Sequence, residues 1–245
     1  MRDYHVEECG QELCGPGVWY LEVKGTVPQM HPGQFCLLSV PGKDLILPRP
    51  FGVVEQKGDK IAFLYRVVGE GTQRLSKMTH GEALTLRGPA GSSFQHSQKL
   101  TYGVAGTLGI APLLFWRNTW GAFEKLFFGV PNKDWEPFAR WLQARVPELV
   151  LYSDDGSIGL KGSCLCGLAG CPTDSHFVAC GPNGMLKAMA TLLPSGSSWE
   201  VSLERRMGCG FGGCHGCVVP LKSGSKRLCV DGPVLSGQEV CWDEL

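Results

Sequence analysis

Four cysteines near the end of the chain constrain its fold more than any other feature. They are Cys209, Cys214, Cys217 and Cys229, spaced C-x4-C-x2-C-x11-C. This spacing is typical of a plant-type [2Fe–2S] cluster, which needs four thiolates converging on one small volume. The glycines among the first three thiols permit backbone conformations with positive φ and leave N–H groups free to bond the sulfurs. The sequence therefore predicts a small C-terminal module that carries single electrons.

Two other roles for these four thiols fit the residue type. Structural zinc sites usually combine two closely spaced cysteine pairs, whereas Cys209 and Cys214 are five residues apart and Cys229 stands alone. Disulfide frameworks are typical of secreted chains, and the opening residues 1–8 show no apolar stretch of a signal peptide. Both comparisons favour the cluster over zinc and over structural thiols.

The composition limits where the chain works and what it binds. Lys plus Arg equals Asp plus Glu at 23 each, so there is no basic field to attract nucleic acid or acidic lipid. No apolar run reaches the length of about 18 residues that a membrane helix needs. The 12 cysteines of a chain with no secretion signal indicate a reducing compartment. We expect a cytoplasmic protein that binds neither nucleic acid nor membrane.

The first part of the chain is predicted to form an antiparallel β-barrel. Short runs rich in Val, Leu, Phe and Tyr are separated by Gly, Pro and Asp, which is a pattern of strands joined by tight turns. The expected strands cover residues 18–23, 34–40, 60–68 and 83–87. Strands of this length and spacing favour a small barrel, with one helical turn over residues 73–78 as its cap.

The second part alternates strand and helix, which predicts a parallel sheet with covering helices. We expect strands over residues 101–105, 125–130, 149–152 and 176–180, and helices over 112–120, 133–145 and 185–193. A linker-like stretch, 194–198, and a strand, 199–203, then lead into the cysteine loop. The predicted fold class is therefore mixed β and α/β, with an antiparallel barrel, a parallel α/β domain and a small C-terminal module.

Three segments of the barrel carry groups that suit a flat ligand bearing phosphates. An arginine lies in a segment stiffened by prolines, and a held guanidinium can make two parallel charge-assisted bonds to a phosphate. A glycine and a hydroxyl stand at the helical turn, whose free amides form a second anion site. A strand ends on an aromatic ring and another cation. The candidate residues are Arg49, Pro50, Phe51, Gly52, Leu64, Tyr65, Arg66, Gly71 and Thr72.

Each of these segments also has an ordinary structural role. The prolines suit an edge strand, Thr72 suits a helix N-terminus, and Arg66 suits a solvated surface. The occurrence of all three in one barrel favours a ligand site.

A glycine-bearing turn lies between the first strand and the first helix of the α/β part. Gly106 and Gly109 are placed where a helix N-terminus can bind a dinucleotide pyrophosphate. The turn is not G-x-G-x-x-G, so a plain βα turn fits it equally well. Cys180 ends another apolar strand before a Gly-Pro bend, which either brings the thiol to a cofactor or serves only as a turn.

The motifs of this chain resemble those of one family over nearly its whole length. Segments similar to the family's flavin, pyrophosphate and nicotinamide motifs lie at residues 49–52, 69–72, 88–94, 105–114, 154–162 and 180–182. The most specific matches are residues 202–207, which run into the cysteines, and residues 229–234. On these motifs the chain resembles the electron-transfer subunits of NAD-dependent (type B) dihydroorotate dehydrogenases, which are ferredoxin reductase-like flavoproteins.

The resemblance implies three domains with one cofactor each. Residues 1–98 would form the FAD-binding β-barrel, residues 99–197 a Rossmann-like NAD-binding domain, and residues 198–245 the [2Fe–2S] domain. The family's flavin segment falls on residues 49–52 and its FAD pyrophosphate segment on residues 69–72.

The resemblance also implies a relay of electrons. A nicotinamide moves two electrons as hydride and a cluster moves one, so FAD, which can do both, stands between them. The implied partner is an FMN-containing catalytic subunit that oxidises dihydroorotate to orotate in pyrimidine biosynthesis, in a heterotetramer with two copies of each subunit. No catalytic acid or base is required on this chain.

Three residues depart from the family pattern. Gly52 stands where the family usually has Ser or Thr, whose hydroxyl can bond the flavin near N5. Ala105 and Thr107 replace two glycines of the nucleotide loop, where their Cβ atoms would push a pyrophosphate outward. We expect Ala105 and Thr107 to weaken NAD(H) binding or change its pose, and Gly52 to alter the tuning of the flavin. The choice between NAD and NADP stays open.

Alternatives to the implied function remain. Subunits of ferredoxin:NADP oxidoreductases and sulfide dehydrogenases use the same relay with another partner, and some replace one cluster cysteine by Asp. Four cysteines and the 202–207 segment favour the dihydroorotate system. A non-enzymatic alternative is an interaction module stabilised by zinc, without flavin. Three more cysteines, Cys164, Cys166 and Cys171, lack an evident fourth ligand and are expected to be isolated thiols.

Overall fold

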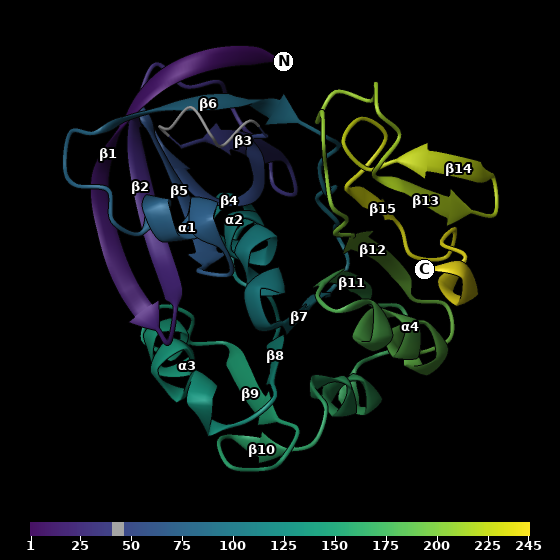
Figure 1. The fold of residues 1–245 in the computed structure, drawn as a ribbon. Coiled ribbons are helices and arrows are strands. Elements are labelled where there is room, and N and C mark those ends of the chain that lie inside the picture. The colour runs from purple at the N-terminus through teal and green to yellow at the C-terminus, as the bar shows by residue number, and fades with distance from the viewer. Residues whose placement is uncertain (41–46) are drawn as a thin grey trace.

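The computed structural model describes residues 1–40 and 47–245 and contains a β-barrel, a parallel sheet with helices, and a small C-terminal hairpin. Figure 1 shows the barrel strands in purple and blue, the parallel sheet below them in teal and green, and the hairpin in yellow. This arrangement confirms the predicted mixed β and α/β fold class. Within the described residues, no helix combines the length and the apolar character needed to cross a membrane.

Six antiparallel strands close the barrel in the order β1-β2-β5-β4-β3-β6. The elements are β1 (Arg2–Gly15), β2 (Val18–Gly25), β3 (Phe35–Ser39), β4 (Arg49–Lys57), β5 (Lys60–Arg66), α1 (Glu70–Leu75) and β6 (Ala83–Ala90). Alternate side chains point inward, so that Leu21, Val53 and Phe63 are fully buried. The sequence did not reveal β1, because the strand is rich in polar residues and only Val6, Glu8, Cys14 and Gly15 are buried.

Seven strands form the sheet in the order β10-β9-β8-β7-β11-β12-β15, all parallel except β15. They are β7 (Thr101–Gly106), β8 (Leu126–Val130), β9 (Leu149–Ser153), β10 (Leu160–Lys161), β11 (His176–Cys180), β12 (Ser198–Ser202) and β15 (Val234–Ser236). The strand order reverses between β7 and β11, where Ala105 lies opposite Cys180. In open α/β sheets, ligands bind outside the carboxyl ends of the strands at such a reversal.

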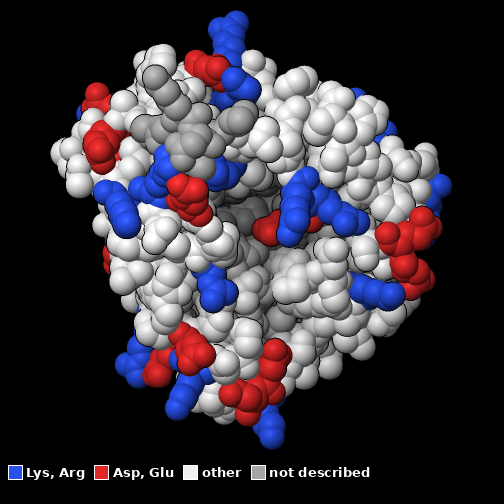
Figure 2. Space-filling view, viewed as in Figure 1, with Lys and Arg blue, Asp and Glu red and all other residues white. Residues whose placement is uncertain are grey.

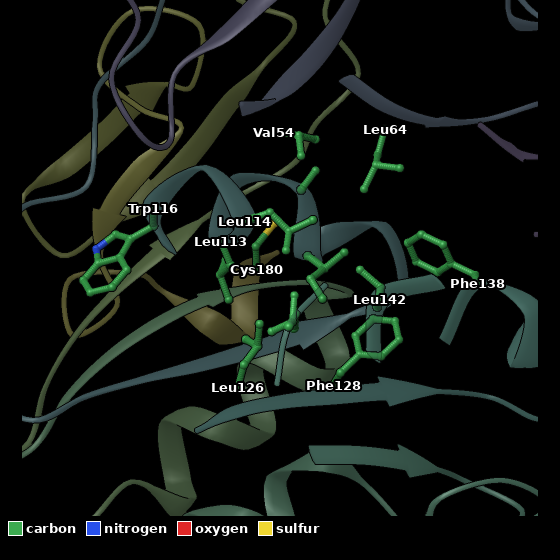
Figure 3. Packing of buried hydrophobic residues seen from close by; sticks show 14 of the residues in the cluster. Val54, Leu64, Leu113, Leu114, Trp116, Leu126, Phe128, Phe138, Leu142 and Cys180 are labelled. Carbon is green, nitrogen blue, oxygen red and sulfur yellow. The ribbon is translucent and has the colours of Figure 1, made fainter. Parts of the chain in front are cut away.

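Helix α2 (Ile110–Trp120) lies between the barrel and the sheet. Its first seven residues are all buried, as expected for a helix that is apolar on every side. Figure 3 shows Leu113 and Leu114 of α2 in one cluster with Val54 and Leu64 of the barrel and with side chains of the sheet. Barrel and sheet therefore share a continuous apolar core.

The remaining helices cover the sheet. They are α3 (Glu136–Gln143), α4 (Asn183–Leu192) and the 3-10 helices η1 (Thr107–Gly109), η2 (Lys133–Trp135), η3 (Cys164–Gly170) and η4 (Trp242–Glu244). The predicted helix over 133–145 is shorter, because Pro137 at the start of α3 separates it from η2. The predicted turn over 73–78 begins three residues earlier, at Glu70, where the Thr72 hydroxyl closes the first turn.

The cysteine loop follows β12 and is completed by the hairpin of β13 (Val218–Leu221) and β14 (Gly224–Arg227). Strands β12 and β15, both beyond residue 197, belong to the seven-stranded sheet. The C-terminal residues also pack on this sheet, since the Trp242 ring stacks on Trp199 with centroids 5.4 Å apart. The domain boundaries at residues 98 and 197 stay a prediction.

Candidate functional site

A cavity of about 410 Å³ lies where the barrel, the sheet and the segment before the cysteine loop meet. Figure 2 shows a hollow near the centre of the molecule, with Lys, Arg, Asp and Glu side chains at its rim. Most of the predicted cofactor residues line the cavity, namely Arg49, Pro50, Phe51, Gly52, Leu64, Tyr65, Arg66, Thr72 and Cys180. The fold thus brings the stiff barrel segment, the end of β5 and the end of β11 to one place.

Gly71 does not line the cavity but shapes its wall. A Cβ on Gly71 would overlap Nε and Cζ of Arg49, so only glycine lets the guanidinium lie against the start of α1. Nη1 of Arg49 donates to the carbonyl of Leu47 at 2.9 Å, which holds the side chain along this wall. The position of the arginine therefore requires the glycine, and the arginine is the group of this pair that lines the cavity.

Gly106 and Gly109 serve a close approach of two chain segments. A Cβ on Gly109 would overlap the carbonyl oxygen of Cys180, and one on Gly106 would lie 2.6 Å from Cδ of Pro182. The turns after β7 and β11 therefore pack backbone against backbone. The structure accounts for both glycines by this packing, and their contact with a nucleotide stays a prediction.

Thr107, one of the departures from the family pattern, has an unusual backbone. Its φ is +49°, in the left-handed region that favours glycine. A residue with a Cβ pays about 1–2 kcal/mol for this conformation. The family's glycine at this position is therefore explained by the left-handed backbone. Thr107 adds strain to the turn after β7.

Two predicted ligand residues use their polar groups within the protein. The Thr72 hydroxyl accepts the N–H groups of Val68 and Gly69 at 3.0 and 3.2 Å and donates to the carbonyl of Gly69 at 3.0 Å. The Tyr65 hydroxyl donates to Oε1 of Gln11 at 2.8 Å. Both side chains shape the cavity wall, with their hydroxyls committed elsewhere.

Three arginines give the cavity a positive lining. Arg49, Arg66 and Arg205 all line it, and no carboxylate of the described residues forms an ion pair with any of them. The Arg66 guanidinium lies 5.3 Å from the centre of the Trp135 ring, a cation–π contact between β5 and η2. Apolar walls with unpaired guanidinium groups suit a flat ring system that carries phosphates. The cavity therefore fits a flavin dinucleotide.

One acidic group and one thiol face the same cavity. Glu204 and Cys180 both line it. Surrounding protein atoms raise the pKa of the Glu204 carboxyl, although the side chain is open to solvent within the cavity. Burial raises the pKa of Cys180 well above its usual value, and the nearby Glu204 charge adds to this effect. The thiol is therefore neutral and acts as an apolar part of the wall.

Sequence reasoning missed one whole wall of the cavity. Residues 202–205, Met207 and Pro233 line it from the C-terminal part. Leu108 of η1 and Ala111 and Pro112 of α2 line it as well. The available signal was the Glu-Arg-Arg run directly after a strand and before the cysteines. That run supported the family resemblance, but its place in a cavity depends on how the modules dock.

The four cysteines of the loop lie in pairs. The N–H of Cys214 donates to Sγ of Cys209 at 3.4 Å, and the N–H of Gly216 donates to Sγ of Cys214 at 3.5 Å. The thiols of Cys217 and Cys229 interact with each other and are both buried. In a [2Fe–2S] cluster each iron takes two thiolates, so two close pairs fit this group.

The backbone prepares the first pair for a charged sulfur. N–H groups of Phe211 and Cys214 lower the pKa of Cys209 to about 6. Burial raises the pKa of Cys229 to about 11, with the neighbouring Cys217 adding to the effect. Gly210 and Gly212 have φ of +73° and +85°, which lets the loop turn its N–H groups toward the sulfurs.

Within residues 1–40 and 47–245, no three His, Cys, Asp or Glu side chains are placed to hold a single metal ion together. This applies to the extra cysteines as well. Sγ of Cys164 is buried 3.6 Å from Sδ of Met185, Cys166 is exposed, and Cys171 donates to the carbonyl of Gly167 at 3.5 Å. The three thiols make different contacts, and their role as isolated cysteines stays a prediction.

Solved structures identify the class of fold. The chain superimposes with a TM-score of 0.80 and 26% identity on the NADH-dependent reduced ferredoxin-NADP oxidoreductase studied for flavin-based electron bifurcation, covering 98% of this chain and 91% of the other. It superimposes with a TM-score of 0.66 and 14% identity on phthalate dioxygenase reductase, covering 92% and 94% of the two chains. The fold is that of the ferredoxin reductase-like proteins.

Sequence comparison identifies the family. A family model described as the iron-sulfur cluster binding domain of dihydroorotate dehydrogenase B matches residues 204–241. The dihydroorotate dehydrogenase B (NAD(+)) electron transfer subunit of Caldanaerobacter subterraneus subsp. tengcongensis is 36% identical over 226 residues, 89% of this chain and 90% of the relative. That of Clostridium acetobutylicum is 32% identical over 237 residues, 91% of each chain. The chain belongs to the family of dihydroorotate dehydrogenase B electron transfer subunits.

Membership of this family confirms several predictions. They are the family itself, the electron-transfer role of an oxidoreductase subunit, and the cofactor set of FAD, a [2Fe–2S] cluster and NAD. It sets aside the zinc-stabilised interaction module. The individual ligand residues stay a prediction.

Replacing Gly71 by Ala should weaken FAD binding with little change in stability. The new Cβ forces the flexible Arg49 guanidinium off the cavity wall, and a lost charge-assisted bond corresponds to about 10-fold or more in affinity. Titration of FAD into the flavin-free protein measures the effect. Gly69→Ala is the matched control, because nothing lies within 4 Å of a Cβ there. Equal affinity of the two variants would contradict the role of Arg49.

Replacing Thr107 by Gly should stabilise the protein by up to about 1 kcal/mol. Glycine removes the Cβ from a left-handed backbone, and part of this gain is offset by its greater freedom in the unfolded chain. The midpoint of urea unfolding measures the change. The same exchange at Thr119, within helix α2, should lower the midpoint instead. A lower midpoint for both variants would show that Thr107 is unstrained.

Proposed function

We propose that this chain passes electrons between NAD(H) and an FMN-containing partner that oxidises dihydroorotate to orotate. FAD would occupy the cavity, and the [2Fe–2S] cluster would bind the thiols of Cys209, Cys214, Cys217 and Cys229. The relatives named as electron transfer subunits of dihydroorotate dehydrogenase B support the partner's reaction. We infer a heterotetramer with two copies of each subunit, acting in the cytoplasm.

The cavity supplies binding and orientation for the flavin. Arg49 offers a held guanidinium for the phosphates, and Leu64 and Pro112 offer apolar surface for the ring. Gly52 leaves open space, since a Cβ there would meet only Cδ of Pro112 at 3.8 Å. A bound flavin exchanges hydride with a nicotinamide and single electrons with a cluster.

The nucleotide would approach from the carboxyl ends of β7 and β11. These ends meet at the reversal of strand order and carry Leu108 and Cys180 into the cavity wall. A nicotinamide ring at this place would lie beside the flavin site. The neutral, buried thiol of Cys180 would exclude water from the contact between the rings.

One observation carries the proposal: a single cavity is lined by the barrel, by the carboxyl ends of the sheet strands and by the segment leading to the cysteines. The cysteine loop is also held on the barrel. A Cβ on Gly210 would overlap Cδ1 of Leu37 in β3, and Cys217 and Cys229 share an apolar core with Phe35 and Leu37. Flavin and cluster would therefore be fixed relative to one another.

An exposed apolar patch beside the cysteine loop is the proposed docking site of the partner. Phe211 is 62% exposed and Val230 is 45% exposed, and Cys214 between the loop glycines is exposed as well. A Cβ on Gly212 would lie 2.8 Å from Cγ2 of Val230, so Val230 covers the loop directly. Large apolar side chains left in solvent next to an electron exit suit a partner surface.

A second candidate partner follows from one structural similarity. The NADH-dependent reduced ferredoxin-NADP oxidoreductase chain is 26% identical to this chain. The relatives at 32–36% identity carry the dihydroorotate dehydrogenase B name, and they favour the dihydroorotate system. Co-purification from the native source separates the two, because only the dihydroorotate system brings an FMN-bearing subunit that oxidises dihydroorotate.

Replacing Cys217 by Ser should remove the cluster but leave flavin reduction intact. A hydroxyl is a poor ligand for iron, whereas the cavity has no contact with this residue. Iron and sulfide content should fall below about half of wild type, while NADH should still bleach the flavin absorption. Cys166→Ser, at an exposed thiol away from the loop, is the control and should keep both properties. Equal loss of NADH reduction of the flavin would contradict separate sites.

Replacing Phe211 by Asp should weaken the complex with the partner by about 10-fold or more, as expected for an aromatic side chain that becomes buried when the partner binds. FAD content should stay unchanged, because the side chain lies outside the cavity. The dissociation constant for the FMN-bearing subunit is the measurement. Leu160→Asp is the control, since Leu160 is 54% exposed on β10 at the other end of the sheet. An unchanged dissociation constant for the Phe211 variant would move the docking site elsewhere.

A further inference from the structure

One arginine of the cavity comes from outside both the barrel and the strands of the sheet. Arg205 lies between the end of β12 at Ser202 and the first cysteine of the loop, and it lines the same cavity as Arg49 and Arg66. Its Nε is buried and has no hydrogen-bond partner. No carboxylate of the described residues pairs with its guanidinium, and neighbouring Glu204 does not bond it.

An unpaired donor of this kind is costly in a protein interior. Leaving a buried polar group without a partner costs about 1–3 kcal/mol, and more for a charged group. Buried charged groups are normally paired or hold a ligand. Arg205 is half-buried, its Nε has no partner in the described structure, and the side chain borders an open cavity. An acceptor atom of a ligand in the cavity would satisfy this donor.

We propose that Arg205 is a flavin-binding residue, contributed by the segment that leads to the cluster, which donates to an oxygen of FAD that carries negative charge. The inference rests on the proposed function, because it takes the cavity as the flavin site. The three arginines of the lining then contact the cofactor from two parts of the chain, Arg49 and Arg66 from the barrel and Arg205 from the segment before the cysteine loop. A guanidinium fork suits both a diphosphate and the oxygens of the flavin ring.

A bond between Arg205 and FAD would also link the flavin to the cysteine loop. Arg205 stands four residues before Cys209, and no helix or strand lies between them. Fixing the guanidinium on FAD therefore restrains the start of the loop. Because coupling between two binding sites is reciprocal, FAD should order the loop, and an assembled loop should hold FAD more tightly.

The test is titration of FAD into the flavin-free protein that retains its cluster, for wild type, Arg205→Gln, Arg205→Lys and Arg206→Gln. Arg206 is the matched control because it is the exposed neighbour in the same pair and does not line the cavity. We expect about 10- to 100-fold weaker FAD binding for Arg205→Gln, from the loss of one charge-assisted bond. The FAD affinity of Arg205→Lys should lie between those of wild type and Arg205→Gln, and the affinity of Arg206→Gln should equal that of wild type.

A second readout does not depend on affinity. Hydrogen exchange of residues 203–217 should slow when FAD binds to the wild type, and this protection should be lost in Arg205→Gln at saturating FAD. Titration with riboflavin in place of FAD shows which part of the flavin Arg205 contacts. If Arg205→Gln weakens the binding of FAD alone, the contact is with the diphosphate; if it weakens the binding of both equally, the contact is with the ring.

The outcomes separate the two proposals. Wild-type affinity and protection in Arg205→Gln, with unchanged iron content, would overturn the role of Arg205 and leave the flavin site standing. Equal weakening in Arg206→Gln would overturn it too, because the effect would then come from general charge. Failure of the wild type itself to bind FAD would overturn the proposed function.

Discussion

The structure depends on the burial of helix α2 between the barrel and the sheet. Its first seven residues are apolar and buried, so both flanking modules gain apolar contact from one helix. Its Phe115 reaches into the barrel core, while Leu113 and Leu114 join the core of the sheet. Ala111 and Pro112 at its start line the cavity. The helix thus fixes the distance between the barrel and the carboxyl ends of β7 and β11, which is the distance between the proposed flavin and nucleotide sites.

The cysteine loop depends on a second set of contacts with the same parts. Gly210 packs on Leu37 of the barrel, and the strand that precedes the loop belongs to the sheet. The loop is therefore attached to both modules that bound the cavity. Such attachment places the proposed cluster site at a constant position beside the cavity, while Phe211 and Val230, the proposed docking patch, are exposed. The proposed nucleotide site, the cavity and the proposed cluster site would therefore follow one another.

The parts of the fold that the sequence could predict are those with local signals. Residues close together in the sequence are enough to recognise three features: the cysteine spacing, the apolar strands of the sheet and the stiff segment around Arg49. Strand β1 carried no such signal, because it is rich in polar residues and few of its side chains are buried. The C-terminal wall with Arg205 was equally hidden, because its position depends on contacts between residues more than a hundred apart in sequence. The sequence suggested that three glycines contact a ligand, whereas the structure explains them by packing. Gly71 makes room for Arg49, and Gly106 and Gly109 make room for the turn after β11.

The central claim is that flavin at the shared cavity connects the nucleotide to the cluster. The direct measurement reduces the cluster of the isolated chain with dithionite, removes the reductant without oxygen and adds NAD+. Dithionite also reduces bound FAD. Protein loaded with FAD should therefore form NADH by hydride transfer from the reduced flavin, and the visible absorption of the oxidised cluster should return as the cluster passes its single electron to the re-oxidised flavin. Protein free of FAD should do neither. Equal recovery of the cluster absorption with and without FAD would contradict the account.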